Sequence, residues 1–430
     1  MKVRKRTFPF KVISALNNFI VRRIFRYKKR LIKSAYSTRR TLINSAFSFI
    51  ILVLRIFVKI IIVDIFSERI GHLAFCTDLF LRKLQLKNEN GFKKIVYIGI
   101  CQSPSANEQL LRMFSRKLFI IPIQLKYYEI IKESIKDNKL IYENSNPMSG
   151  YSHFLEFNNT SVNLIFSKEE EEHGTELLAE MGIGDKDWFV CFHNRDSLYL
   201  EKNAKMLYGT ERDWSYHDYR DSSIKTFIPA AEYIVKKGGF AIRMGRDAAE
   251  KLPGDLHPHI IDYAQNHWSD FGDIYLSAKC AFFLGSNAGL SVVPYIFHKP
   301  MIMTNYTPMF TGFSPRLDNI AIPCKIYSIK EERYLSFREI FNSEINHWGS
   351  GHQFAKAGLE VLPSNEEEIL DVTKEMYARV FTKGYEYTDD DKELRDQFRS
   401  LYPPTHECYD TPVSEMISID FLRKNEVLIK

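Results

Sequence analysis

Short apolar runs alternate with helical segments between residues 188 and 306. The apolar runs, each typical of a buried strand, cover residues 188–193, 240–245, 259–264, 280–285 and 300–305. Segments with helical periodicity lie at residues 222–237, 270–279 and 290–297. Ser222 or Ser223 suits the N-cap of the first helix, and Gly238 follows its end. This alternation predicts a doubly wound α/β fold with a parallel sheet, which binds ligands beyond the carboxyl ends of its strands.

The alternation extends toward both ends of a chain of 430 residues. Residues 94–100 and 117–123 are predicted to be buried strands, followed by a helix near 127–139 and a turn-rich segment at 143–150. Further helices are expected at 169–181, closed by Gly182 or Gly184, and in two acidic stretches at 366–380 and 389–401. A chain of this length exceeds one ordinary core, so we expect two domains with additional segments.

The charge of the chain is unevenly distributed. Residues 1–63 contain 16 of the 59 Lys and Arg and none of the 53 Asp and Glu, so the remainder carries 43 basic and 53 acidic side chains. A cationic arm on an acidic body binds an anionic surface, either a membrane or a nucleic acid. Residues 46–63 include 15 apolar residues, and Ser48, Arg55 and Lys59 would form one narrow polar stripe on a helix. That apolar surface favours a membrane over a nucleic acid.

Three placements of the predicted helix at 46–63 remain open. Its two central charges cost about 5–7 kcal/mol on insertion into a bilayer, and the apolar residues return a similar amount. The six cysteines are widely spaced without a CxxC motif, which fits a reducing compartment and argues against a zinc site. We therefore expect a basic, amphipathic helical arm that lies in the plane of the inner membrane, with a single span or a buried core helix as alternatives.

Polar residues follow the predicted strands at the edge where a ligand would bind. They are His193-Asn194-Arg195-Asp196, Arg243-Met244-Gly245-Arg246, Gly285-Ser286-Asn287-Ala288-Gly289 and Asn305-Tyr306. Arginine presents a rigid fork of donors to phosphate oxygens. A helix start preceded by Ser, Asn and Gly offers free backbone amides. The combination predicts a site for a diphosphate whose charge these groups meet without a metal.

Each of these features also has a structural interpretation. Arg195 could pair with Asp196, Arg243 could form a structural salt bridge, and the turn at 285–289 could be only a helix start. The segment 196–221 is long for a loop inside a compact domain, which favours a functional loop. It contains residues suited to stacking on a base or sugar, namely Asp213, Trp214, Tyr216, His217, Asp218, Tyr219 and Arg220. A variable surface insertion is the alternative.

Several of these motifs resemble a bacterial family of glycosyltransferases associated with surface polysaccharides. They are CFHNRDS, YHDYRDS, AIRMG and FFLGSNAGLSVVPYIFHKP, together with RIGHLA at 69–74, so that the resemblance covers roughly residues 69–310. HNRD is also distantly similar to a strand end of fucosyltransferases, where an arginine grips the donor diphosphate; that role would fall on Arg195. Asp196 follows Arg195 directly, which departs from the fucosyltransferase spacing. FLGSNAGL is similar to a small-residue turn in the donor domain of heptosyltransferase-like enzymes.

The resemblance implies a GT-B fold, in which two facing Rossmann-like domains enclose the substrates and the C-terminal one holds the donor. The expected partition is a membrane-associating arm at 1–66, an acceptor-side domain at 67–165, a donor domain at 166–335 and a helical extension at 336–430. His72 of RIGHLA would be a catalytic base or an acceptor contact at the cleft, with a structural histidine as the alternative, and Asp196 is the second catalytic candidate. The expected donor-binding residues are His193, Asn194, Arg195, Tyr219, Arg220, Arg243, Gly245, Ser286, Asn287 and Gly289.

The expected activity is transfer of a sugar from a nucleotide-sugar donor to a surface-polysaccharide or lipid-linked glycan acceptor. We expect no cofactor, no metal and no nucleic-acid partner, and a cytoplasmic location, peripheral at the inner membrane. Two alternatives remain open. A metal-dependent GT-A transferase would use a DxD motif, which residues 185–187 and 389–391 match loosely. A non-catalytic membrane adaptor of polysaccharide assembly would need the basic arm but not the strand-end arginines.

Overall fold

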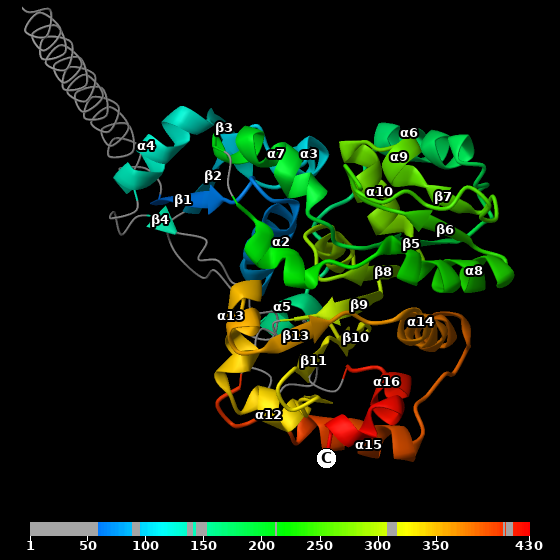
Figure 1. The fold of residues 1–430 in the computed structure, drawn as a ribbon. Helices are drawn as coiled ribbons and strands as arrows, with labels where there is room; N and C mark the ends of the chain where they lie inside the picture. Colours follow the sequence, from blue (N-terminus) through cyan, green and yellow to red (C-terminus); the bar gives the residue numbers. More distant parts are fainter. Residues whose placement is uncertain are drawn as a thin grey trace, which may run out of the picture.

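Two parallel β-sheets and a smaller antiparallel sheet organise the chain, with helices packed around them (Figure 1). The computed structural model describes residues 59–87, 95–135, 141–142, 153–210, 213–307, 316–406, 409 and 416–430. The predicted α/β fold with parallel sheets is confirmed. Residues 1–58 of the predicted arm and the turn-rich segment at 143–150 lie outside the described residues.

The first parallel sheet has the strand order β3-β2-β1-β4. Its strands are β1 (Lys59–Ile65), β2 (Ile95–Ser103), β3 (Phe119–Gln124) and β4 (Ile141–Tyr142). The helices of this region are α2 (Ile70–Leu86), α3 (Glu108–Ser115), α4 (Leu125–Ile135) and α5 (Phe154–Asn158). β1 is an inner strand, paired in parallel with β2 and β4. Val63 and Ile65 of β1 are fully buried, so this strand belongs to the core.

The predicted apolar helix at 46–63 is wrong at its C-terminal end, since Lys59–Ile65 forms β1. Residues 60–63 are all β-branched, which favours a strand. A short apolar run fits a buried strand or a buried helix equally well by its periodicity. Pairing with β2 and β4 decides between the two, and the polar stripe predicted to include Lys59 is not formed there.

β3 differs from the buried strand predicted at 117–123. It is an edge strand of its sheet, and Phe119 is 67% exposed while Ile121 is 39% exposed. By contrast, Ile100 and Cys101 of the neighbouring β2 are buried. An apolar sequence predicts that a strand forms, but the position of the strand in the sheet determines how far its side chains are buried.

The second parallel sheet has six strands in the order β10-β9-β8-β5-β6-β7. They are β5 (Phe189–His193), β6 (Phe240–Arg243), β7 (Ile260–Asp262), β8 (Phe283–Ser286), β9 (Met301–Tyr306) and β10 (Ile320–Pro323). β5 to β9 confirm the five predicted strands. The order reverses between β5 and β8, because the chain extends the sheet first on the β6 side and later on the β9 side. Such a switch point leaves a crevice at the carboxyl ends of β5 and β8.

The helices around this sheet follow the predicted pattern. They are α6 (Lys168–Glu180), α7 (Leu198–Tyr208), η2 (Ser215–Arg220), η3 (Ile224–Phe227), α8 (Ile228–Lys236), α9 (Tyr263–Asn266), α10 (Asp270–Lys279), η4 (Leu290–Val292) and α11 (Val293–Ile296). Gly182 follows α6 with a φ of +78°, the left-handed conformation of a closing glycine. The predicted loop at 196–221 is wrong in part, because it contains α7 and η2. Ala204 and Leu207, about one turn apart on α7, are both buried.

The chain ends in helices and a three-stranded antiparallel sheet of order β12-β11-β13. These elements are β11 (Lys325–Ser328), β12 (Arg333–Tyr334), α12 (Phe337–Phe341), η6 (Glu344–His347), α13 (Gly351–Lys356), β13 (Leu359–Leu362), α14 (Glu366–Phe381), α15 (Asp389–Arg399), α16 (Ile419–Lys424) and η8 (Glu426–Leu428). α14 and α15 confirm the two predicted acidic helices. α14 packs against α8, and its Glu375 pairs with Arg395 of α15 at 3.1 Å.

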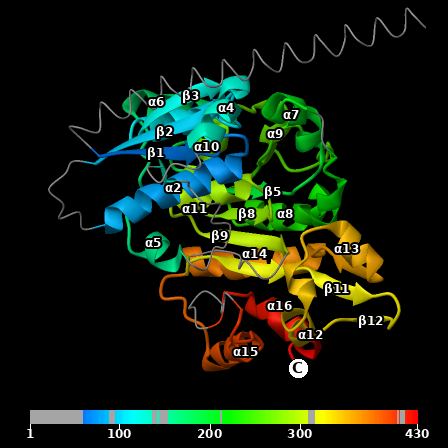
Figure 2. The same cartoon turned by 90° about the vertical axis from the view of Figure 1, so that its left-hand side faces the viewer.

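α2 lies between the two parallel sheets (Figures 1 and 2). One hydrophobic cluster includes residues of both sheets, among them Val63 of β1 and Ile302 of β9. None of the helices in the described part of the chain is long and apolar enough to cross a membrane. The domain boundaries expected from the sequence remain predictions.

Candidate active site

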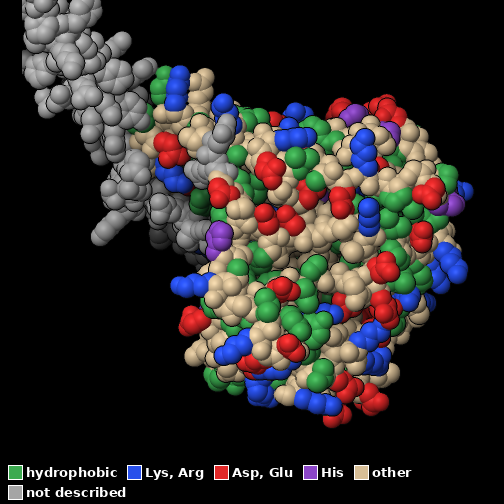
Figure 3. All heavy atoms as spheres, in the orientation of Figure 1, with side chains coloured by type: hydrophobic (Ala, Val, Ile, Leu, Met, Phe, Trp, Pro, Cys, Tyr) green, Lys and Arg blue, Asp and Glu red, His purple; other side chains and the backbone are tan. Residues whose placement is uncertain are grey.

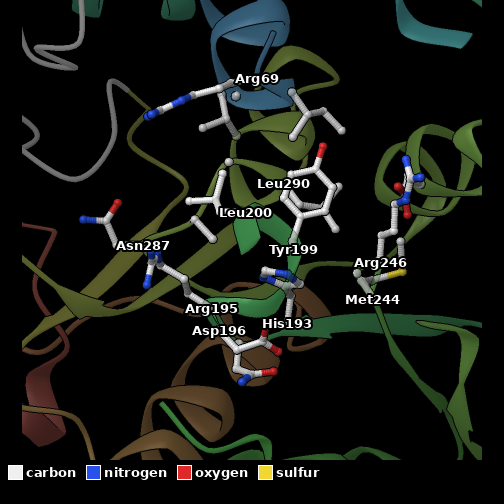
Figure 4. A pocket seen from close by; sticks show the side chains of 18 of the residues that line it. Arg69, His193, Arg195, Asp196, Tyr199, Leu200, Met244, Arg246, Asn287 and Leu290 are labelled. Atoms are coloured by element: carbon white, nitrogen blue, oxygen red, sulfur yellow. The ribbon is translucent and has the colours of Figure 1, made fainter. Parts of the chain in front are cut away.

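A cavity of 310 Å³ opens between the carboxyl ends of the second sheet and the start of α2 (Figure 4). Nine of the twelve residues predicted from the sequence line it: His72, His193, Asn194, Arg195, Asp196, Arg220, Gly245, Asn287 and Gly289. Tyr219, Arg243 and Ser286 do not line it. The fold thus brings the RIGHLA motif together with the segments that follow β5, β6 and β8.

The residues after β5 and β8 meet because these strands are neighbours. The backbone N–H of Arg195 donates to Ser286 Oγ at 2.7 Å, and Ser286 is fully buried. Asn194 Nδ2 donates to the Ser222 carbonyl at 2.6 Å, and Asn287 Nδ2 donates to a backbone carbonyl just after β9. Ser286, Asn194 and Asn287 therefore shape the site by holding the backbone around it.

Arg195 forms an ion pair with Asp221 and not with Asp196. The two carboxylate oxygens of Asp196 accept hydrogen bonds from the backbone N–H groups of Leu198 and Ala249, each at 3.1 Å. Asp196 thereby ties the segment after β5 to the segment after β6. Because both oxygens are engaged with the backbone, this geometry favours a positioning role over the predicted catalytic role.

Four arginines line the pocket: Arg69, Arg195, Arg220 and Arg246. Burial, with repulsion from Arg220, lowers the pKa of Arg195 to about 10. Burial, with repulsion from Arg69, also lowers the pKa of Arg220. The buried Nε of Arg220 has no hydrogen-bond partner among the described residues. Buried like charges destabilise one another, and an anion bound among them would relieve that cost.

The histidines that face these arginines are neutral at pH 7. Burial and the charge of Arg69 lower the pKa of His72 to about 4. Burial and nearby arginines lower the pKa of both His193 and His217 to about 3. The pocket therefore combines guanidinium cations with uncharged imidazoles. This lining suits an anionic ligand beside a group that can accept a proton.

Arg243 has the structural role that the sequence left open. It is fully buried at the end of β6, where its Nη1 donates to Asp262 Oδ2 at 3.1 Å. Gly245, with a φ of +124°, turns the chain, and Arg246 lines the pocket instead. Tyr219 packs against a phenylalanine ring of α13. Neither Arg243 nor Tyr219 lines the pocket, and the donor-binding roles expected for them remain predictions.

Sequence reasoning did not assign roles to Arg69, Arg246, Trp268 and Asp273, which also line the pocket. Arg69 and Arg246 stood in motifs that were already singled out, so their charge was a visible signal. Asp273 lies inside the pattern of α10, which gave no sign of a site. It is buried, and burial raises its pKa to about 8.

The segment that carries α7 and η2 reaches from the second sheet to the first. Arg69 Nε donates to Tyr208 Oη at 2.6 Å, and the Arg69 guanidinium lies 4.7 Å from the centre of the Trp214 ring. Gln102, at the end of β2, donates to the Leu207 carbonyl at 2.7 Å. Trp214 also stacks with two rings of η2. These aromatic residues, suited by sequence to stacking on a ligand, are stacked on one another.

α2 packs directly on the segment after β8. A Cβ atom on Gly71 would lie 2.9 Å from Gly289 Cα, so the two backbones touch. Farther along α2, Arg82 is fully buried and its Nη2 donates to the carbonyl of Ile296 in α11 at 3.1 Å. These contacts hold His72, the residue after Gly71, against the pocket.

No protein-family model matches the chain, and no curated protein matches it. Several solved structures are similar to it. The glycosyl transferase of family 9 from Veillonella parvula DSM 2008 is 10% identical over 62% of this chain and 86% of its own, with a TM-score of 0.38. The ADP-heptose lps heptosyltransferase II of E. coli is 10% identical over 61% of this chain and 90% of its own, with a TM-score of 0.39.

A third similar structure is TibC, a dodecameric iron-containing heptosyltransferase solved in complex with ADP-D-beta-D-heptose. It is 9% identical over 76% of this chain and 80% of its own, with a TM-score of 0.38. Because these identities and TM-scores are low, the function of this chain is inferred from its own pocket.

Proposed function

We propose that the protein is a glycosyltransferase of GT-B type that moves a sugar from a nucleotide-sugar donor to a surface-polysaccharide or lipid-linked glycan acceptor. The proposal is carried by the pocket at the switch point of the second sheet, where buried arginines face a neutral histidine of α2. Arg195 and Arg220 would bind the donor diphosphate, and His72 would serve the acceptor. Buried arginines beside a neutral base suit such a transfer.

In the proposed reaction, the bond between the anomeric carbon of the sugar and the donor phosphate oxygen breaks, and a bond from the acceptor oxygen forms. His72 accepts the proton of the acceptor hydroxyl, which its uncharged ring can do at pH 7. Arg195 and Arg220 stabilise the negative charge that grows on the departing nucleoside diphosphate. Asp196 and Ser286 act on this step indirectly, because they hold the backbone that carries Arg195.

Binding of nucleoside diphosphates tests the role of the arginines. UDP, GDP and ADP, together with the monophosphate CMP, are screened by thermal shift, and the best nucleoside diphosphate is then titrated by calorimetry. Arg195→Ala or Arg220→Ala should weaken binding by about 1.5–3 kcal/mol, because each removes a charged hydrogen bond. Arg338→Ala, at an exposed position of α12, is the matched control and should bind like the wild type. Unchanged affinity in both pocket variants would contradict the proposal.

We propose that transfer needs no divalent metal, because the arginines can meet the charge of the leaving group. Among the described residues, no group of three or more His, Cys, Asp and Glu could hold a metal ion. Transfer of sugar from the donor identified by the thermal-shift screen should therefore continue in EDTA at its rate without EDTA. Loss of activity on chelation, restored by manganese, would favour the metal-dependent GT-A alternative instead.

We propose that residues 1–58 attach the protein to the cytoplasmic face of the inner membrane, where lipid-linked acceptors lie. This segment contains 15 Lys and Arg and no Asp or Glu. On the face of the body shown in Figure 3, Lys and Arg are interspersed with Asp and Glu. That face offers no surface of a single sign, whereas the charge and the apolar residues of the arm suit attachment to an anionic membrane.

A further inference from the structure

The two ends of the pocket differ in their chemistry (Figure 4). Arg195 and Asn287 lie on one side of it, and Met244 and Arg246 lie on the other. The lining on the side of Arg246 also includes Ala248 of the same segment, Trp268, which contacts Arg246, and Asp273, which accepts a hydrogen bond from Trp268. Whereas the first end gathers buried arginines, the second combines planar groups with apolar ones.

Trp268 and Arg246 form a fixed stack at this second end. The carbon of the Arg246 guanidinium lies 4.3 Å from the centre of the Trp268 ring, within the range of a cation–π contact. The indole N–H of Trp268 donates to Asp273 Oδ2 at 3.1 Å. Because Asp273 is buried in α10, this bond holds the orientation of the ring. Asp273 is therefore a positioning residue for Trp268.

The charge of Arg246 is already met inside the protein. Its Nε lies 3.3 Å from Asp247 Oδ2, and Asp247 also accepts a hydrogen bond from Asn203 Nδ2 at 3.0 Å. The pairing with Asp247 and the contact with the Trp268 ring fix the orientation of the Arg246 guanidinium plane. The Arg246 side chain remains 30% exposed and lines the pocket. Met244 and Ala248 beside it give sugar hydroxyls no side-chain partner.

We propose that this end of the pocket is the nucleobase subsite, in which the base of the donor stacks on the Arg246 guanidinium and Trp268 supports it from behind. The inference rests on the proposed function, because it presupposes a nucleotide donor. Bases stack on guanidinium planes as well as on aromatic rings. The rings around Trp214 do not offer such a surface, since they stack on one another and on Arg69.

Two ligands test the two ends of the pocket independently. The preferred nucleoside diphosphate would contact both ends, whereas inorganic pyrophosphate, which has no base, would contact only the arginine end. The first is titrated into the full-length protein by calorimetry, and the second is measured by its displacement of the first. Arg246→Lys keeps the charge but removes the plane, and Trp268→Leu removes the support. Each variant should lower the affinity for the nucleoside diphosphate at least about 5-fold, the lower end of what one stacked base contributes. The affinity for pyrophosphate should stay unchanged. Arg338→Lys is the matched control.

The outcomes distinguish this subsite from the function on which it rests. If the wild type binds no nucleoside diphosphate, the proposed function falls and the subsite falls with it. If the wild type binds one but Arg246→Lys binds it equally well, only the subsite is overturned. The subsite is also overturned if Arg246→Lys lowers the affinity for pyrophosphate as much as the affinity for the nucleoside diphosphate, because Arg246 would then be a phosphate ligand. Arg246→Lys decides the matter even if Trp268→Leu fails to fold.

Discussion

His72 is a neutral imidazole at physiological pH, because burial and the charge of Arg69 both disfavour its protonated form. The ring of Phe66 meets it edge-on at 6.1 Å, which adds to the apolar surroundings. A base must be unprotonated before it acts. With its pKa lowered from 6.5 to about 4, the free enzyme keeps a competent base above that pH and loses it only as the pH falls through the lower value.

We predict that kcat/KM, which reports the free enzyme, stays level as the pH is lowered from about 7 to about 5.5, where an ordinary histidine is already mostly protonated. His72→Gln should lower kcat by about 10²–10⁴-fold, the usual contribution of a general base, and leave nucleoside-diphosphate affinity near that of the wild type. Initial rates and calorimetry measure the two effects. His173→Gln, at an exposed position of α6, is the control. Full activity in His72→Gln would mean that another group accepts the proton of the acceptor hydroxyl.

At the residue scale, the segments predicted from the sequence line the pocket, but not every side chain predicted in them does. Arg243 and Arg246 are three positions apart, and the sequence favoured the first because it follows a strand. The first pairs with Asp262 in the core, and the second lines the pocket beyond the turn at Gly245. A turn with positive φ redirects the chain in a way that residue type alone does not specify. The hydrogen bonds from backbone N–H groups to the Asp196 carboxylate could likewise not be predicted from the sequence.

At the scale of elements, the contact between α2 and the segment before η4 sets the distance from base to diphosphate. We predict that Gly71→Ala lowers kcat and leaves nucleoside-diphosphate affinity near normal, since an added Cβ would lie 2.9 Å from Gly289 Cα and would force α2 away. Loss of alignment between reacting groups costs rate even where binding survives. Steady-state kinetics and calorimetry on the same preparation measure the two quantities.

The control for this variant is Gly254→Ala, because a Cβ at Gly254 would have no neighbour within 4 Å. It should change neither kcat nor affinity. Equal loss of kcat and of affinity in Gly71→Ala would mean that the contact forms the donor site itself. Wild-type kcat would mean that α2 does not position the base.

Element types could be predicted where a pattern was long and periodic, as in α10 and α14. β1 was missed because an apolar run of β-branched residues fits a membrane helix and a central strand alike. α7 was missed because only three of its residues, Asn203, Ala204 and Leu207, are buried, so its sequence shows no clear apolar stripe. The exposure of β3 depends on its edge position, which no local pattern encodes. For these elements, the local sequence does not determine the type or the exposure alone; the strands and helices packed against them also do.

At the scale of the whole molecule, the alternation of segments predicted a parallel sheet but not its strand order. The pocket exists because β5 and β8, which are separated by two other strands in sequence, are neighbours in space. Its second wall comes from α2, which follows β1 of the other sheet. Convergence of the RIGHLA motif with the strand ends was expected only through the family resemblance, because spacing alone carries no information on how two sheets meet.

The arm and the body meet at β1, and this decides how the arm can be removed. Deleting residues 1–66 would also delete β1, the strand that joins β2 to β4. Deleting residues 1–58 leaves β1 complete. We predict that the shorter deletion folds, binds nucleoside diphosphate and no longer sediments with vesicles of anionic lipid, whereas the longer deletion does not fold. Circular dichroism, calorimetry and co-sedimentation with the full-length chain as reference measure these properties.

Salt and alkali separate the two contributions that the arm would make. Attraction between its cations and anionic lipid should weaken as the Debye length falls from about 10 Å at 0.1 M to about 3 Å at 1 M salt. The apolar residues of the arm should retain part of the full-length protein at high salt, and alkaline carbonate should release it because an in-plane helix does not span. If the shorter deletion sediments with vesicles as much as the full chain does, the body and not the arm binds the membrane. Digestion of the body only from the periplasmic side would show that the arm spans the membrane, against peripheral attachment.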